Sequence, residues 1–304
     1  MNGQNDVATR ATYGIAPTGF RLPDETRLGA VRLQVSDLER SLDYYQRVIG
    51  LRVLHRDGGT ATLAAHGDDR PLVVLRERAG AAPVPPHGRL GLYHFAVLLP
   101  TRADLGRFLR HLAESGARAG ASDHLVSEAL YLRDPDGLGI EVYADRPRSV
   151  WEAHGHELRM ATVPLNAEEV LREAGDAPWT GVPAGTTIGH VHLHVGDLDR
   201  AASFYHEALG FDKVVWSYPG ALFLSAGGYH HHLGLNTWAA GAPPPGEDDA
   251  KLLDWSLVLP DAESAAAAAE SLERAGYPVE RSGDREFTTR DPWGTALRLQ
   301  SAGS

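Results

Sequence analysis

Cysteine is absent from the 304-residue sequence. This excludes disulfides, thiolate metal ligands and iron–sulfur clusters, so any metal would have to be held by histidine and carboxylate side chains. Long hydrophobic runs are also missing, and residues 1–26 lack the apolar core of a signal peptide. Basic residues are outnumbered, and the formal net charge of −11 opposes binding to nucleic-acid phosphates. We therefore expect a cytoplasmic protein with no membrane or nucleic-acid partner.

Histidine, in contrast, is plentiful, with 15 residues. The hydrophobic content of 43% and the charged content of 23% are ordinary for a globular protein. The chain is long enough for two domains with cores of their own.

The chain repeats one pattern with an offset of 160 residues. Leu33, Val35, Asp37, Tyr45 and Gly50 recur as Leu193, Val195, Asp197, Tyr205 and Gly210. Each copy divides again into two units, each with one strand, one helix and three further strands. Asp37 is placed to cap the first helix, and Gly50 is placed to end it. The sequence therefore predicts an α+β fold of four βαβββ units, at about 28–76, 92–145, 188–238 and 252–300.

This repeat also sets the expected domain organisation. We expect a loose N-terminal arm at residues 1–26 and a first repeat, with units one and two, at 27–148. A connecting segment at 149–186 contains one short helical pattern, Asn166–Ala174. The second repeat, with units three and four, follows at 187–304.

The two copies differ at three equivalent strand positions. The first copy has Ala30, His94 and Glu141 there, and the second copy has His190, Asp254 and Arg298. Neither copy contains two histidines and a glutamate at these positions, but the two copies together do. Two imidazoles and one carboxylate form the ligand set of non-haem Fe(II) oxygenases.

Each of these residues also has a simpler interpretation. Glu141 alternates with apolar residues, and a glutamate on a half-buried strand usually faces water. A single histidine such as His94 is more often a satisfied polar residue than a metal ligand. His190, His192 and His194, however, share one face of a single strand, and three imidazoles in a row are hard to explain as core filling.

A second group of histidines, His230, His231 and His232, follows two glycines and a tyrosine. Such a run can be a surface tract that scavenges metal. Here it continues into the apolar segment Leu233–Leu235, so we expect at least one of these imidazoles to point inward. For Tyr131, a core tyrosine is the simpler interpretation.

Over about residues 28–300 the sequence resembles the vicinal oxygen chelate superfamily, and within it the bacterial catechol 2,3-dioxygenase branch of the type I extradiol dioxygenases. The resemblance is carried by His94-Phe95-Ala96, residues 123–148, the strand His190–Val195 and the segment Gly227–His232. It implies that two βαβββ units close into one incomplete barrel around a divalent metal. It also implies cleavage of a catechol ring next to the diol with O2.

The resemblance assigns roles to six residues. It implies that His94, Glu141 and His190 bind Fe(II), and the same ligand set also fits Mn(II). It implies that His231 is the acid–base residue. Tyr131 and His124 would form hydrogen bonds with the oxygen ligands.

The order of the units departs from the usual family pattern, in which units three and four build the site. Unit four has Asp254 and Arg298 at the ligand positions, and unit one has Ala30. We therefore expect units two and three to pair around the metal, and units one and four to pair without metal. We also expect Asp254 and Arg298 to form a buried ion pair inside the second barrel.

Two other functions remain open. One is a glyoxalase-like, metal-dependent lyase or isomerase, which normally uses four protein ligands. The other is a metal-free protein of the same fold that binds small molecules. The sequence leaves open which catechol is cleaved and whether the chain forms a homo-oligomer.

Overall fold

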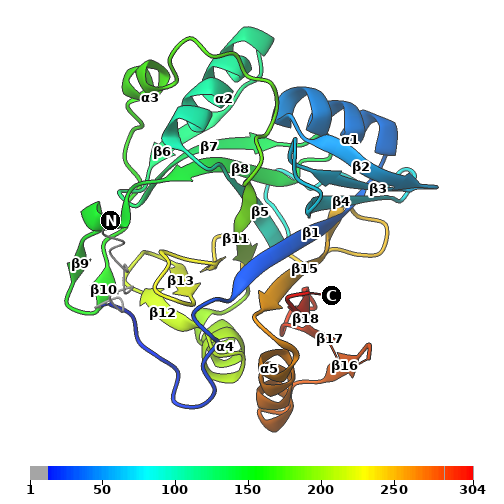
Figure 1. Ribbon diagram of the computed structural model, residues 1–304. Helices are drawn as coiled ribbons and strands as arrows, with labels where there is room; N and C mark the ends of the chain where they lie inside the picture. Colours follow the sequence, from blue (N-terminus) through cyan, green and yellow to red (C-terminus); the bar gives the residue numbers. More distant parts are fainter. Residues whose placement is uncertain (1–12, 284, 304) are drawn as a thin grey trace.

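The computed structural model describes residues 13–283 and 285–303, and its strands form two curled eight-stranded sheets (Figure 1). The first sheet contains β1 (Arg27–Val35), β2 (Arg52–Asp57), β3 (Thr60–Ala64), β4 (Pro71–Glu77), β15 (Lys251–Leu259), β16 (Val279–Arg281), β17 (Glu286–Arg290) and β18 (Ala296–Ser301). The second sheet contains β5 (Gly91–Leu98), β6 (Gly120–Asp123), β7 (Ser127–Arg133), β8 (Gly139–Asp145), β11 (Thr187–His194), β12 (Asp212–Val215), β13 (Ala221–Ser225) and β14 (Leu233–Asn236).

Each sheet combines one unit from each sequence copy. The strand orders are β16-β17-β18-β15-β1-β4-β3-β2 and β12-β13-β14-β11-β5-β8-β7-β6. The units join where β1 pairs antiparallel with β15, and where β5 pairs antiparallel with β11. The predicted fold class and the pairing of unit two with three and of unit one with four are therefore confirmed.

A helix follows the first strand of each unit. These helices are α1 (Leu38–Tyr44), continued by the π-helical turn η1 (Tyr45–Ile49), then α2 (Arg102–Ser115), α4 (Leu198–Ala202), continued by η3 (Ser203–Ala208), and α5 (Ala262–Arg274). Asp37 accepts a hydrogen bond from the Arg40 amide at the start of α1, and Gly50 adopts a φ of 89° at the end of η1. Both predicted helix boundaries are confirmed, because a left-handed residue is easiest for glycine.

The segment between the two copies contains little regular structure. It has the short 3-10 turn η2 (Arg148–Val150), the hairpin β9 (Ala153–His154) and β10 (Glu157–Leu158), and the helix α3 (Ala167–Glu173). Asn166 caps α3, which confirms the predicted helical pattern. None of the described helices is long and apolar enough to cross a membrane.

Residues 13–26, the described part of the predicted arm, pack against unit three. Ile15 forms a bridge with Lys213 in β12, and the Leu22 side chain is buried. Arg21 donates two hydrogen bonds to the carboxylate of Asp212. This part of the arm is therefore held in place, while residues 1–12 lie outside the described residues.

The core lies between the helices and the convex faces of the sheets. On β11, Val191 and Leu193 are fully buried in this core. The alternation of a strand then directs His190, His192 and His194 to the concave face of the same sheet. The sheet thus separates an apolar core from a histidine-rich interior.

The expected ion pair in the other sheet has additional partners. Arg298 Nε lies 3.6 Å from Asp254 Oδ1, which is too long for a hydrogen bond. Arg298 also pairs with Glu286 at 3.1 Å, and Arg32 lies 3.4 Å from Asp254. The expected ion pair between Asp254 and Arg298 is therefore present, but the Arg298 side chain is 29% exposed and the pair is part of a larger cluster instead of a closed, two-residue bridge. Arg32 and Glu286 complete a cluster of four charged residues around this pair.

Gly189 precedes His190 in β11, and its lack of a side chain leaves room for the Tyr143 side chain, which reaches it from β8 across β5. A Cβ atom at Gly189 would lie 1.8 Å from the Tyr143 hydroxyl oxygen. We expect Gly189→Ala to lower the free energy of unfolding by roughly 1–3 kcal/mol, because an added methyl group must displace Tyr143 or β11. Urea unfolding measures this change.

Gly120→Ala is the matched control, because a Cβ there would meet Tyr131 at an ordinary 3.6 Å. It should leave the free energy of unfolding nearly unchanged. Equal stability of the two variants would contradict the close approach at Gly189.

Candidate metal centre and catalytic pocket

His94, Glu141 and His190 come from three adjacent strands of the second sheet. β5 lies between β8 and β11, and Ala96 of β5 is paired with Glu141 on one side and with His190 on the other. His94 lies two residues before Ala96 and therefore points to the same concave face. Because the Ala96 side chain is small, it leaves space in which the side chains of His94, Glu141 and His190 can meet.

The ligand atoms of these residues lie close together. Glu141 Oε2 is 3.0 Å from His94 Nε2 and 3.1 Å from His190 Nε2. Neighbouring ligand atoms on an octahedral ion with bonds of about 2.1 Å would lie about 3 Å apart. All three side chains are buried, and His94 Nε2 has no hydrogen-bond partner among the described residues. The three groups therefore fit a divalent metal ion.

The protonation states also suit metal binding. Burial lowers the pKa of His94, which outweighs the opposing effect of the Glu141 carboxylate. Burial alone would raise the pKa of Glu141, but the adjoining imidazoles of His190 and His94 hold it well below its ordinary value. A metal ligand set needs neutral imidazole and ionised carboxylate, and these environments favour both.

A cavity of about 310 Å³ opens beside these three residues. His124, Tyr131 and His231 line it, so the structure brings all six predicted site residues together. Sequence reasoning missed the remaining walls of the cavity. These include Tyr93, Met160, Thr162, Tyr218, Phe223 and Trp238. Met160 and Thr162 belong to the connecting segment, which has no counterpart elsewhere in the repeat.

His124 and Tyr131 form one hydrogen-bonded unit on the cavity wall. His124 Nδ1 lies 2.9 Å from the carbonyl oxygen of Ala161, so this nitrogen donates. In the neutral ring, Nε2 then accepts from the Tyr131 hydroxyl at 2.6 Å. Burial, and then the charge of Glu141, raises the pKa of Tyr131 well above its ordinary value. Tyr131 therefore remains a phenol.

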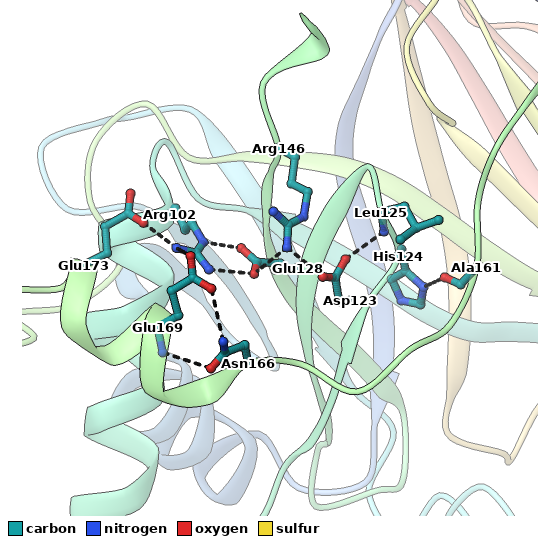
Figure 2. A network of polar contacts seen from close by, with 10 residues as sticks. All are labelled: Arg102, Asp123, His124, Leu125, Glu128, Arg146, Ala161, Asn166, Glu169 and Glu173. Carbon is teal, nitrogen blue, oxygen red and sulfur yellow. Dashed lines mark hydrogen bonds and ion pairs between the residues drawn. The ribbon is translucent and has the colours of Figure 1, made fainter. Parts of the chain in front are cut away.

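An ion-pair network behind the cavity fixes the turn that carries His124 (Figure 2). Leu125 has a φ of 71°, and its amide donates to the Asp123 carboxylate at 2.8 Å. Arg146 links Asp123 to the buried Glu128, at 2.6 and 3.0 Å. Glu128 is in turn paired with Arg102 of α2. This network supports a backbone conformation that is unfavourable for leucine.

His231 lies beside His190 on the cavity wall. Its ring centre is 4.1 Å from that of His190, and only 5% of the residue is exposed. Burial, and then the His190 imidazole, lowers the pKa of His231 well below its ordinary value. His231 is therefore neutral near pH 7 and can accept a proton.

The other two histidines of β11 interact with Asn236 instead. The Asn236 amide nitrogen lies 2.9 Å from His192 Nε2, and its carbonyl oxygen lies 2.6 Å from His194 Nδ1. One amide can donate to the first ring and accept from the second. This bridge engages one nitrogen of each ring, while the His192 ring packs against that of His94 with ring centres 5.0 Å apart.

The fold of four βαβββ units, with a buried group of two histidines and one glutamate that could hold a metal ion, agrees with the comparison with known families. The chain belongs to the Glyoxalase/Bleomycin resistance protein/Dioxygenase superfamily, whose family model matches residues 27–142 and 187–299. It is 47% identical over 274 residues to a protein of Bacillus subtilis (strain 168) named catechol-2,3-dioxygenase, covering 88% of this chain and 95% of the relative.

Two further similarities are more distant. A Rhodococcus globerulus protein named biphenyl-2,3-diol 1,2-dioxygenase 3 is 28% identical over 142 residues, covering 45% of this chain and 75% of that protein. The crystal structure of glyoxalase I from Zea mays superimposes with a TM-score of 0.52 at 19% identity, covering 91% of this chain and 92% of that one. The second similarity concerns the fold alone.

Replacement of His190 tests the metal centre. We expect His190→Ala to lose most bound iron, because two ligands hold a divalent ion much more weakly than three. His192→Ala is the matched control on the same strand and face, and it should retain the metal. Iron per chain is measured by elemental analysis after anaerobic loading with Fe(II) and desalting. Equal iron content in the two variants would exclude His190 as a ligand.

Proposed function

We propose that the protein is an Fe(II)-dependent extradiol dioxygenase that cleaves a catechol ring next to the diol with O2. The convergence of His94, Glu141 and His190 beside a cavity of suitable size supports this proposal most strongly. The 47% identity to a protein named catechol-2,3-dioxygenase supports the same reaction. Mn(II) is the alternative metal, because the same ligand types accept it.

His94, Glu141 and His190 would hold Fe(II), which would supply Lewis-acid and one-electron chemistry toward the catechol and O2. His231 would accept a proton from the catechol and return it to an oxygen of the product. The Tyr131 hydroxyl and His124 would orient the oxygen atoms by hydrogen bonds. The mostly apolar and aromatic walls would hold the ring and exclude water.

The structure gives less support to the two rival functions. A glyoxalase-like lyase would need a fourth protein ligand, and Glu141 is the only carboxylate among the described residues that line the cavity. A metal-free binding protein would have no use for two buried imidazoles whose Nε2 atoms both lie about 3 Å from one carboxylate oxygen.

An oxygen-uptake assay tests the reaction. The protein is loaded anaerobically with Fe(II) and mixed with catechol in air-saturated buffer. We expect equimolar consumption of O2 and catechol, with formation of a yellow ring-opened semialdehyde. A colourless diacid product, or no oxygen uptake by iron-loaded protein, would contradict extradiol cleavage.

His231→Phe separates acid–base catalysis from metal binding. Phenylalanine fills the space but cannot exchange a proton, so kcat should fall by about 10²–10⁴-fold while the iron content stays unchanged. His232→Asn is the control, since its side-chain oxygen can still accept the hydrogen bond that His232 Nδ1 receives from the Ala226 amide. Near-normal turnover by His231→Phe would exclude the proposed role.

The cavity chemistry also predicts which substituents are accepted. None of the described residues that line the cavity is a lysine or an arginine. Arg118 and Arg133 line a separate depression that shares Tyr93, His94 and Tyr131 with the cavity. A carboxylate on the ring would therefore be buried without a countercharge. We expect kcat/KM for 4-methylcatechol to exceed that for 3,4-dihydroxybenzoate by roughly tenfold or more, a difference of about 1.4 kcal/mol.

The two compounds differ mainly in whether a methyl group or a carboxylate occupies the same ring position. Initial rates of oxygen uptake at several concentrations give both constants. Equal or higher kcat/KM for 3,4-dihydroxybenzoate would contradict an uncharged substrate pocket.

A further inference from the structure

A chain of three side chains leads from the end of β8 to His231. His230 Nε2 lies 2.9 Å from Asp145 Oδ1, and His230 Nδ1 lies 2.8 Å from His231 Nδ1. His230 is fully buried, so neither of its ring nitrogens can be satisfied by bulk water. Both nitrogens therefore depend on these two contacts.

The hydrogen-bonding capacity of each group fixes the direction of this chain. A carboxylate oxygen only accepts, so His230 Nε2 carries a proton and donates it to Asp145. In a neutral ring the other nitrogen, Nδ1, then has a lone pair and must accept. The proton in the 2.8 Å contact therefore belongs to His231 Nδ1. Neutral His231 is left with its lone pair on Nε2.

His231 Nε2 has no hydrogen-bond partner among the described residues, and the ring lines the cavity. Both features suit a base that accepts a proton from a bound substrate. With the opposite tautomer, Nε2 would carry a proton and could not accept one. Which nitrogen of His231 is protonated therefore decides whether the ring can act as a base.

The Asp145 carboxylate is itself held by Tyr229, which Tyr143 contacts in turn. The Tyr229 hydroxyl donates to Asp145 Oδ1 at 3.1 Å, and the Tyr143 hydroxyl lies 2.6 Å from that of Tyr229. Since Tyr229 donates to Asp145, Tyr143 donates to Tyr229. Tyr229 thus acts as a donor to Oδ1, which agrees with the accepting role of this oxygen toward His230.

We propose that Asp145 and His230 are positioning residues that fix the tautomer of His231, with the proton on Nδ1 and the lone pair on Nε2 facing the cavity. The catalytic consequence rests on the proposed dioxygenase function, but the tautomer itself does not. When Nε2 accepts a proton, the resulting imidazolium donates from Nδ1 to His230, which still donates to Asp145. The positive charge on His231 is thereby stabilised without any further rearrangement.

Two substitutions at His230 separate this role from simple filling of space. The side-chain oxygen of His230→Asn can stand near the original Nδ1 and accept from His231, whereas His230→Leu offers no acceptor. Asp145→Asn is the third variant, because its amide group can donate to His230 Nε2. If the amide donates to His230 Nε2, the His230 proton moves to Nδ1 and is donated to His231 Nδ1. The proton of His231 is then on Nε2.

The primary readout is the ¹⁵N spectrum of the histidine rings in the full-length chain, recorded with and without Zn²⁺. The His231 signals are identified by their loss in His231→Phe. We expect the wild type and His230→Asn to show His231 protonated on Nδ1. We expect His230→Leu to show a mixture of tautomers, and Asp145→Asn to shift the population toward Nε2–H.

A second readout is turnover by the iron-loaded protein. The kcat of Asp145→Asn and His230→Leu should fall by about 10²-fold or more, as for a base held in the wrong tautomer. The iron content and the KM should change little, and His230→Asn should recover most of the lost kcat. A wild-type His231 protonated on Nε2, or an unchanged tautomer in both Asp145→Asn and His230→Leu, would overturn the proposal. Absence of dioxygenase activity in the wild type would instead refute the proposed function and leave the tautomer result standing.

Discussion

β5 and β11 pair antiparallel at the centre of the second sheet, and this pairing joins the two sequence copies at the candidate site. It places His190 opposite Ala96, while the parallel pairing of β5 with β8 places Glu141 opposite the same alanine. A shift of one residue in either register would turn an entire row of side chains to the other face. The apolar residues of these strands, which must face the helices, prevent such a shift. Core packing therefore determines the geometry of the polar site.

Burial of the site controls the protonation states that its proposed chemistry needs. Burial lowers the pKa of His94 and of His231, which keeps both imidazoles neutral, and raises the pKa of Tyr131, which keeps it a hydrogen-bond donor. Each neutral ring has one nitrogen that donates and one that accepts. The hydrogen-bond partners of a ring, such as the Ala161 carbonyl for His124, determine which nitrogen donates and which accepts. Burial and fixed partners thus give the ring nitrogens of these groups defined hydrogen-bonding roles.

The sequence predicted the residues of the candidate site better than it predicted the residues that surround the site. Repetition at a fixed offset revealed the four units, and the ligand types missing from each copy revealed how the units pair. The cavity walls were missed because Met160 and Thr162 lie in a segment with neither a repeat nor a strong periodicity. The binding of Asn236 between His192 and His194 also depends on strand register, which alternation alone does not fix. The sequence also could not predict the ion-pair network behind His124, because only the tertiary fold brings its residues together.

The two sheets share the same backbone arrangement, but their side chains have opposite charge distributions at equivalent positions. In the second sheet, one carboxylate faces two neutral imidazoles, an arrangement that attracts a cation. At the equivalent place in the first sheet, Asp254 faces the guanidinium groups of Arg32 and Arg298, which would repel one. Burial raises the pKa of Asp254 despite both arginines, so even its own charge is weakened there. Side-chain differences at a few equivalent positions of a duplicated fold therefore separate a candidate catalytic centre from a structural ion-pair cluster.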